Sequence, residues 1–195
     1  GVSTVAEEPG YPLLRRTRRR LPHWEREGAT YLLTWRCTPG TTLTPAERGV
    51  VLDNLLHWHG RRYRLLAATV MPDHVHCLLR PLPLPSGCGS HPLRVITHTA
   101  KGFTAKAIRR LRGGRGPVWQ DESFDRIVRD TEELSSLMEY IRFNAVVRGL
   151  AARPEDYPWL VTRTPRDPDG PPVRQDVDAS GQARPPAPRE AGAAG

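Results

Sequence analysis

The sequence predicts an α+β domain with a ferredoxin-like antiparallel sheet, helices on one face of that sheet and a further helix at the C-terminal end. Strand-like runs alternate with segments of helical apolar spacing in the order β-α-β-β-α-β-α. The second and third strand segments are separated by residues 71–73 alone. A parallel crossover needs a dozen residues or more, so these strands should be antiparallel neighbours. The order matches a split β-α-β domain followed by a helix.

The first strand is expected over residues 31–37, where apolar and β-branched side chains precede a Thr-Pro-Gly stop. Thr44 followed by Pro45 is typical of a helix start with proline at the first helical position. That helix should run to about residue 59. His57 and His59 diverge on a helix, so we interpret them as surface residues and not as metal ligands.

Two further strands are expected over residues 63–70 and 74–80. Residues 81–92, rich in Pro, Gly and Ser, should form a loop, and a long helix should follow over 93–111. The side chains expected to face inward on this helix are Val95, Ile96, Thr99, Phe103, Ala107 and Ile108. Those expected to face outward are Lys101, Lys106, Arg109 and Arg110.

The segment 113–117 has the composition of a hinge-like loop. A short strand is expected at 118–119, and 124–128 fits either another strand or a turn of helix. The last helix should cover about 131–147, with Thr131 at its capped start and Gly149 at its stop.

The domain boundaries follow from composition. We expect a flexible leader over 1–12, one folded domain over 13–162 and a disordered tail over 163–195. The tail is rich in Pro, Gly and Ala and shows no apolar periodicity, so it cannot bury a core.

Charge and cysteine content narrow the function classes. The 195-residue chain has a formal net charge of +8, and its arginines cluster at 15–20, 61–64 and 109–115. Arginine matches phosphate geometry, which favours a nucleic-acid partner, although solvated surfaces or a GC-rich genome would produce similar runs.

The 3 cysteines lack Cys-x-x-Cys spacing, so neither a disulfide framework nor a zinc knuckle is indicated. No apolar run approaches membrane-spanning length and no signal peptide is visible, which favours a cytoplasmic protein without a membrane partner.

The most informative motif is His74-Val75-His76. Residues two apart on a strand point the same way, so both imidazoles should leave one face while Val75 packs behind them. Two imidazoles held side by side form half of a metal site. Two solvated or hydrogen-bonded histidines are the simpler alternative.

A second constellation lies on the last predicted helix. Tyr140 and Asn144 are four residues apart, so they share one side of the helix. A phenol is a candidate nucleophile, and an amide oxygen beside it is a candidate third metal ligand. The structural alternative is a tyrosine at the core edge and an asparagine in the last helical turn.

Taken together, these motifs resemble the single-tyrosine HUH transposases, and most closely the REP-associated tyrosine transposases of bacteria. The resemblance runs from about residue 13 to 162. Its matching segments are residues 20–24, 30–36, 71–76, 96–104, 118–129 and 155–159, together with the Tyr140–Asn144 turn. One departure concerns the family's Asn-Pro-Val, which is Asn144-Ala145-Val146 here. Alanine allows the helix to continue where proline would bend or end it.

The resemblance implies an HUH nuclease fold and a metal-dependent enzyme that cleaves single-stranded DNA and transfers the strand. It implies that Tyr140 forms a 5′-phosphotyrosine and that His74, His76 and Asn144 hold Mg²⁺ or Mn²⁺. The implied partner is single-stranded or hairpin DNA from REP-like palindromes, handled by a monomer or homodimer associated with the bacterial nucleoid. Candidate DNA-binding residues are Arg16, Arg18, Arg19, Lys101, Lys106, Arg126 and Arg129. For the last two arginines, a structural pairing with Asp125 or Asp130 is an equal alternative.

Two rival functions remain at this point. The histidine-triad nucleotide hydrolases also begin their signature with His-x-His, but they need a third histidine where this chain has Leu78. The other rival is a catalytically idle, sequence-specific DNA-binding protein derived from a transposase. Binding alone requires none of His74, His76, Tyr140 and Asn144, so their joint presence favours the enzyme.

Overall fold

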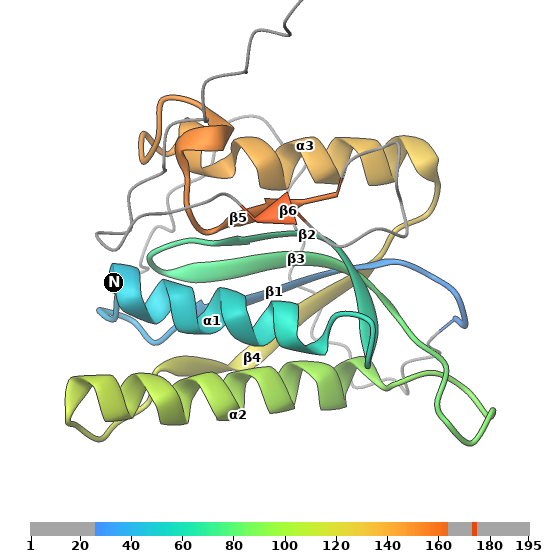
Figure 1. The fold of residues 1–195 in the computed structure, drawn as a ribbon, viewed down its shortest axis with the longest axis horizontal. Coiled ribbons are helices and arrows are strands. Elements are labelled where there is room, and N and C mark those ends of the chain that lie inside the picture. The colour runs from blue at the N-terminus through green and yellow to red at the C-terminus, as the bar shows by residue number, and fades with distance from the viewer. Residues whose placement is uncertain (1–25, 164–172, 175–195) are drawn as a thin grey trace, which may run out of the picture.

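A computed structural model describes residues 26–163 and 173–174 (Figure 1). The elements in chain order are β1 (Tyr31–Cys37), α1 (Pro45–Trp58), β2 (Tyr63–Val70), β3 (His74–Pro81), α2 (Leu93–Arg112), β4 (Trp119–Ile127), α3 (Thr131–Val147), a 3-10 turn (Pro154–Asp156), β5 (Leu160–Thr162) and β6 (Val173–Arg174). The predicted leader and most of the predicted tail lie outside the described residues, as do Arg16, Arg18 and Arg19.

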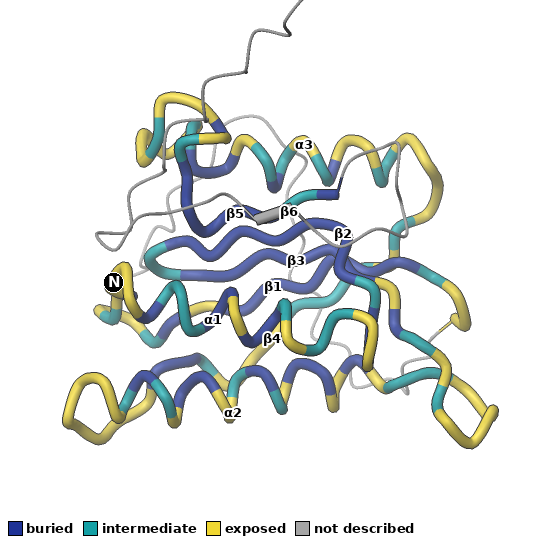
Figure 2. The backbone as a smooth tube through the Cα atoms, in the orientation of Figure 1, coloured by how far each residue is buried: buried dark blue, intermediate teal, exposed yellow. Residues whose placement is uncertain are grey.

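The strands form one sheet in the order β4-β1-β3-β2-β5-β6 (Figure 1). Every neighbouring pair is antiparallel, including β2 and β3, which only residues 71–73 connect. The first four strands therefore have the ferredoxin-like arrangement that the sequence predicts. In Figure 2 the central strands β1, β2 and β3 are buried along most of their length, so the sheet is the centre of the core.

The register assigns the helices to the two faces of the sheet. Trp35 pairs with Val75 across β1 and β3, and paired side chains share a face. Trp35 also contacts Trp119, whose indole N–H donates to Thr104 of α2 at 3.0 Å. The α2 face is therefore the Val75 face. His74 and His76 project to the opposite face, where α3 packs against β2 and β3.

Helix α1 begins as predicted. The Thr44 hydroxyl accepts a hydrogen bond from the Glu47 amide, and the Glu47 carboxylate accepts one from the Thr44 amide, which is a complete capping box. Arg112 at the end of α2 donates to the same carboxylate at 2.6 and 2.8 Å. This ion pair joins the two helices that cover the Val75 face.

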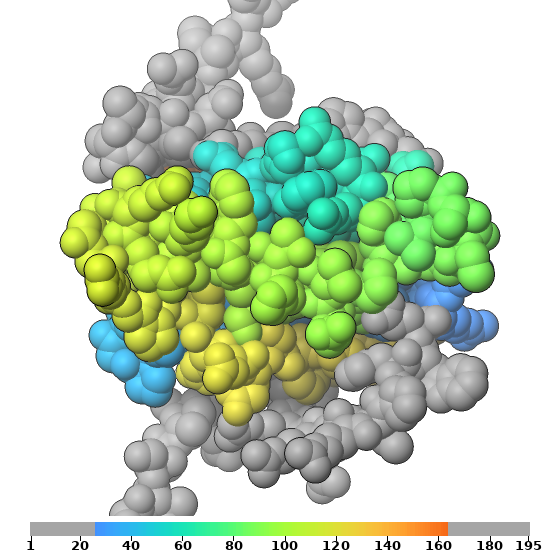
Figure 3. Space-filling view, turned by 90° about the horizontal axis from the view of Figure 1, so that it is seen from below, coloured from blue at the N-terminus to red at the C-terminus, as the bar shows by residue number. Residues whose placement is uncertain are grey.

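The predicted inward face of α2 is partly wrong. Ile96 and Ile108 are buried as expected, whereas Val95 is 41% and Phe103 58% exposed. The buried face includes threonines, such as Thr104, whose hydroxyl is satisfied by the carbonyl oxygen of Ala100. A hydroxyl that bonds back to its own helix can enter the core, and an apolarity pattern cannot detect this. Figure 3 looks onto α2, with α1 along one side and β4 along the other.

Two other expectations need correction. Residues 118–119 and 124–128 belong to one continuous strand, β4, which pairs with β1 through a register shift between Trp35 and Cys37. The sequence did not predict one continuous strand because the middle of β4 is polar. Polar side chains are tolerated there because β4 lies at the edge of the sheet. His59 is not a simple surface residue: its Nδ1 accepts from the Leu65 amide at 3.0 Å, and the guanidinium of Arg163 lies 2.7 Å from its Nε2.

Helix α3 has the predicted extent, but its N-cap is Asp130 and not Thr131. The Asp130 carboxylate accepts from the Glu133 amide at 2.7 Å. The helix ends at Val147 and Gly149 follows with a φ of 69°, the left-handed conformation that favours glycine at a helix stop. Helix continues through Ala145, as expected where proline is absent. No helix in the described ranges combines the length and apolar composition needed to cross a membrane.

Candidate active site

The two histidines of the His-x-His motif are buried side by side on β3. His74 is 0% and His76 1% exposed, and their ring centroids are 4.6 Å apart. Both leave the sheet on the α3 face, while Val75 and Cys77 between and beyond them are fully buried on the other face. The alternation expected from the sequence is confirmed. Solvated histidines are thereby excluded, whereas hydrogen-bonded histidines, the other half of the simpler alternative, agree with the contacts of both rings.

The orientation of His74 follows from its neighbour Asp73. Nδ1 of His74 lies 2.8 Å from Oδ1 of Asp73. The hydrogen bond to His74, with the charges of His74, Arg148 and Arg36, holds the pKa of Asp73 well below its ordinary value despite partial burial. An ionised carboxylate can only accept, so Nδ1 of His74 carries the proton that joins the two side chains. Among the described residues the buried Nε2 of His74 has no hydrogen-bond partner.

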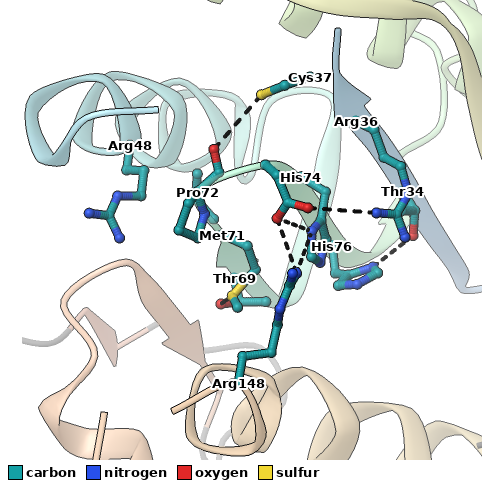
Figure 4. Close-up of polar contacts among 12 residues, drawn as sticks. Thr34, Arg36, Cys37, Arg48, Thr69, Met71, Pro72, His74, His76 and Arg148 are labelled. Carbon is teal, nitrogen blue, oxygen red and sulfur yellow. Dashed lines mark hydrogen bonds and ion pairs between the residues drawn. The ribbon is translucent and has the colours of Figure 1, made fainter. Parts of the chain in front are cut away.

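His76 has a partner at each nitrogen. Nδ1 lies 2.8 Å from the hydroxyl of Thr34, its cross-strand neighbour on β1 (Figure 4). Nε2 lies 3.2 Å from the hydroxyl of Tyr140 on α3. Burial, together with the charges of His74 and Arg36, lowers the pKa of His76 well below 6.5. His76 is therefore neutral at neutral pH and available as a ligand or proton acceptor.

Three side chains spaced four residues apart on α3 and its C-cap face these histidines. Tyr140 contacts His76, and Arg148 lies 3.1 Å from Oδ1 of Asp73 and 3.3 Å from Nδ1 of His74. Asn144 is midway between Tyr140 and Arg148 on the same side of the helix. It is 4% exposed, and its buried Oδ1 has no hydrogen-bond partner within the described chain.

These atoms fit the donor set of a divalent metal. In the described ranges, no group of three or more His, Cys, Asp and Glu side chains is arranged to hold a metal ion, so a third protein ligand would have to be an amide or hydroxyl. The Nε2 of His74 and the Oδ1 of Asn144 are buried without hydrogen-bond partners among the described residues. A buried polar atom without a partner destabilises the folded protein unless a bound ligand contacts it. A carboxylate on the far nitrogen of a histidine is also a recurrent feature of metal sites.

The lysines predicted to bind DNA are remote from this group. Lys101 and Lys106 lie on α2, which packs against the opposite face of the sheet. The ammonium of Lys101 donates to the Asp121 carbonyl at 2.8 Å and to Ser123 at 3.2 Å, and burial lowers its pKa. Lys106 is exposed. Neither side chain is placed to contact a phosphate beside the histidines.

Arg126 and Arg129 are on the same side of the sheet as α3, where both form ion pairs with Glu133. Burial acts to raise the pKa of Glu133, but hydrogen bonds from Arg129 and the charge of Arg126 outweigh it and lower that pKa. The structural alternative for these two arginines is therefore supported, but their partner is Glu133 and not Asp125 or Asp130.

Sequence reasoning missed four residues of this site: Thr34, Arg36, Asp73 and Arg148. Asp73 adjoins the motif, and Arg148 continues the four-residue spacing of Tyr140 and Asn144, so both had a usable signal. Thr34 and Arg36 are the cross-strand neighbours of His76 and His74, and only the β1–β3 register identifies them.

Comparison with known proteins finds relatives in sequence and in fold. No family model matches the chain. A Haemophilus influenzae protein named as a candidate REP-associated tyrosine transposase is 26% identical over 105 residues, which are 50% of this chain and 57% of that protein. A solved REP-associated tyrosine transposase bound to a REP hairpin superposes with a TM-score of 0.56 at 18% identity, over 73% of this chain and 81% of that one. The chain resembles the REP-associated tyrosine transposases.

The resemblance to REP-associated tyrosine transposases has two independent parts. The sequence match covers little more than half of the Haemophilus protein, and the structural match establishes a common fold. That fold is the α+β arrangement expected for an HUH nuclease. A Deinococcus radiodurans structure described as a candidate transposase aligns more weakly, with a TM-score of 0.41 and 19% identity over 63% of this chain and 95% of that one.

Proposed function

We propose that this chain cleaves and rejoins single-stranded DNA next to hairpin-forming repeats, as a REP-associated tyrosine transposase. The observation that supports this most directly is the contact between two elements far apart in sequence. The Tyr140 hydroxyl lies 3.2 Å from Nε2 of buried His76, in a site where His74 and Asn144 each present a buried atom without a partner. A nucleophile beside a set of buried nitrogen and oxygen donors is the arrangement that metal-assisted phosphoryl transfer requires.

In the proposed cleavage step, the Tyr140 oxygen attacks the scissile phosphorus. A bond forms between Tyr140 and the 5′-phosphate, and the bond from phosphorus to the 3′-oxygen breaks. The 3′-oxygen leaves as a hydroxyl after taking up a proton, and the phenol loses its own. The covalent link keeps the phosphodiester energy, so a second 3′-hydroxyl can reverse the step and rejoin DNA without a nucleotide cofactor.

We propose that Nε2 of His74, Nε2 of His76 and Oδ1 of Asn144 hold Mg²⁺ or Mn²⁺. Bound there, the ion would supply charge stabilisation at the scissile phosphate. Mn²⁺ accepts imidazole more readily than Mg²⁺ does, so we expect it to be the better probe of the site. Neutral His76 is in the ligand form without prior loss of a proton, and the contact of Asp73 with Nδ1 leaves Nε2 as the nitrogen of His74 that can bind a metal ion.

The proposed DNA partner is a hairpin with a single-stranded flank. The solved relative is bound to a REP hairpin, and the net charge of +8 of this chain favours a polyanion. The four proposed catalytic groups, His74, His76, Asn144 and Tyr140, meet within a single chain, an arrangement that either a monomer or each subunit of a homodimer can provide.

The decisive experiment incubates the protein with Mn²⁺ and a labelled hairpin that has a single-stranded flank. A denaturation-resistant adduct should form with the wild type and with Tyr31→Phe, a control that alters a hydroxyl bonded to the Arg26 backbone. The adduct should be absent from Tyr140→Phe, while fold and hairpin affinity persist. An adduct on Tyr140→Phe would refute the nucleophile. Hairpin binding without any adduct from the wild type would instead indicate an idle DNA-binding protein.

A further inference from the structure

Asp73 lies where three elements meet beside the proposed metal site. Its carboxylate is 2.8 Å from Nδ1 of His74 on β3 and 3.1 Å from the guanidinium of Arg148 at the C-cap of α3. The guanidinium of Arg36 on β1 lies 3.9 Å away. Figure 4 shows Arg36 and Arg148 approaching from two sides, next to His74. Of these three partners of Asp73, only His74 has a role in the proposed cleavage step; the two arginines have none.

The contact with His74 determines which nitrogen of a buried ring is available. While Asp73 accepts at Nδ1, the proton stays there and the Nε2 lone pair faces the α3 side. A neutral amide in the place of the carboxylate can donate to Nδ1 instead. The proton would then move to Nε2, and His74 would lose the lone pair that a metal ion needs.

Arg148 acts on the other half of the site. It follows Asn144 by four residues and Tyr140 by eight, so it lies on the same side of α3 and its C-cap. Its bond to Asp73 joins the end of that helix to the start of β3. The ion pair between Arg148 and Asp73 therefore fixes the position of α3, and with it Tyr140 and Asn144, relative to the two histidines. Neither Arg148 nor Asp73 is a proposed metal ligand.

We propose that Asp73 and Arg148 are positioning residues for the metal site: Asp73 presents Nε2 of His74 as a ligand, and Arg148 holds α3 so that Asn144 and Tyr140 face the same point. This inference rests on the proposed function, because it concerns the same metal. Neither residue touches the reacting atoms in this arrangement.

The test combines Asp73→Asn, Arg148→Ala and Arg148→Lys with the control Asp156→Asn, which removes a carboxylate from an exposed ion pair with Arg153. Imidazole ¹⁵N shifts of His74 in the metal-free protein report the tautomer, and calorimetry reports Mn²⁺ affinity. Asp73→Asn should move the His74 proton to Nε2 and weaken Mn²⁺ binding by about 10–100-fold. Arg148→Ala should leave the tautomer unchanged but weaken binding, and Arg148→Lys should recover part of the loss.

The outcomes separate this inference from the proposed function. If the wild type binds Mn²⁺ and Asp73→Asn keeps both the tautomer and the affinity, the positioning role of Asp73 is wrong and the proposed function stands. Unchanged affinity in Arg148→Ala would likewise remove Arg148 from the proposal. A wild-type protein that binds no Mn²⁺ would overturn the proposed function and the inference together. Asp156→Asn should match the wild type in both measurements.

Discussion

The Tyr140 hydroxyl occupies the one nitrogen of His76 that faces α3, at a distance of 3.2 Å, while Thr34 occupies the other nitrogen. A ring nitrogen has a single lone pair, so Nε2 cannot accept the phenol proton and bind a metal ion at the same time. Tyr140 and the proposed metal ion would therefore compete for His76. If Nε2 of His76 binds the ion, the Tyr140 hydroxyl should leave this nitrogen, and its oxygen would be free to approach a phosphate.

Tyr140→Phe should consequently bind Mn²⁺ more tightly than the wild type. Loss of a competing hydrogen bond worth about 1 kcal/mol corresponds to an increase of roughly fivefold. Calorimetry with Tyr31→Phe as the matched control would measure it. A weaker affinity in Tyr140→Phe would mean that the hydroxyl helps to hold the ion.

His74→Ala with His76→Ala should abolish Mn²⁺ binding, because two of the proposed ligands are lost and the remaining amide oxygen binds weakly alone. His57→Ala is the appropriate control, since His57 is an exposed histidine on α1. The measurement is the Mn²⁺-induced rise in melting temperature. An equal rise in the double variant would exclude the site.

Substitutions at Asn144 should have opposite effects on the metal-free and metal-bound protein. Asn144→Asp puts a carboxylate in a site that is 4% exposed, which should destabilise the metal-free protein by about 2 kcal/mol or more. The added charge should strengthen Mg²⁺ and Mn²⁺ binding. Asn144→Ala should weaken Mn²⁺ binding at least about tenfold, as loss of outer-shell partners already does. Thermal unfolding with and without Mn²⁺ would separate the two effects, and equal metal-induced shifts in both variants would contradict the ligand assignment.

The stability of the metal-free protein should fall as the pH drops below about 6.5. Burial lowers the pKa of His76 well below that value, so the unfolded chain takes up a proton before the folded protein does. Above the pKa of His76 in the unfolded chain, both states hold a neutral His76 and the free energy of unfolding is not reduced. Below it, the free energy of unfolding should decrease by at most about 1.4 kcal/mol per pH unit for one histidine. Urea unfolding between pH 5 and 8 would measure the slope. His76→Gln should flatten it and His57→Gln should not; a pH-independent stability would contradict the assignment.

The salt dependence of hairpin binding should distinguish arginines that contact phosphates from those already paired. Alanine substitution of Arg16, Arg18 and Arg19 should reduce the slope of log affinity against log salt by about 0.7–0.9 for each lost phosphate contact. Arg126→Ala should change the slope less, because Arg126 pairs with Glu133 within the domain. Equal slopes in the triple variant and the wild type would remove this basic run from the interface.

The errors made from the sequence share a physical cause. Phe103 was expected inside because it is apolar, but Thr104 takes the core position by bonding back to Ala100. The strand β4 was divided in two because its polar middle lacks periodicity, although pairing with β1 makes it continuous. In both cases the structure contains hydrogen bonds that apolar spacing does not report.

The sequence by itself determined the fold class, the burial of Val75 behind the two histidines, and the shared helix side of Tyr140 and Asn144. Each of these depends on a local period of two or four residues, which is visible in the order of residues alone. Only the tertiary structure decided that Tyr140 meets His76, that Thr34 lies beside His76, and that Arg148 reaches Asp73. Those contacts depend on the β1–β3 register and on the packing of α3 against the sheet, which are set by pairing and burial between segments up to 75 residues apart.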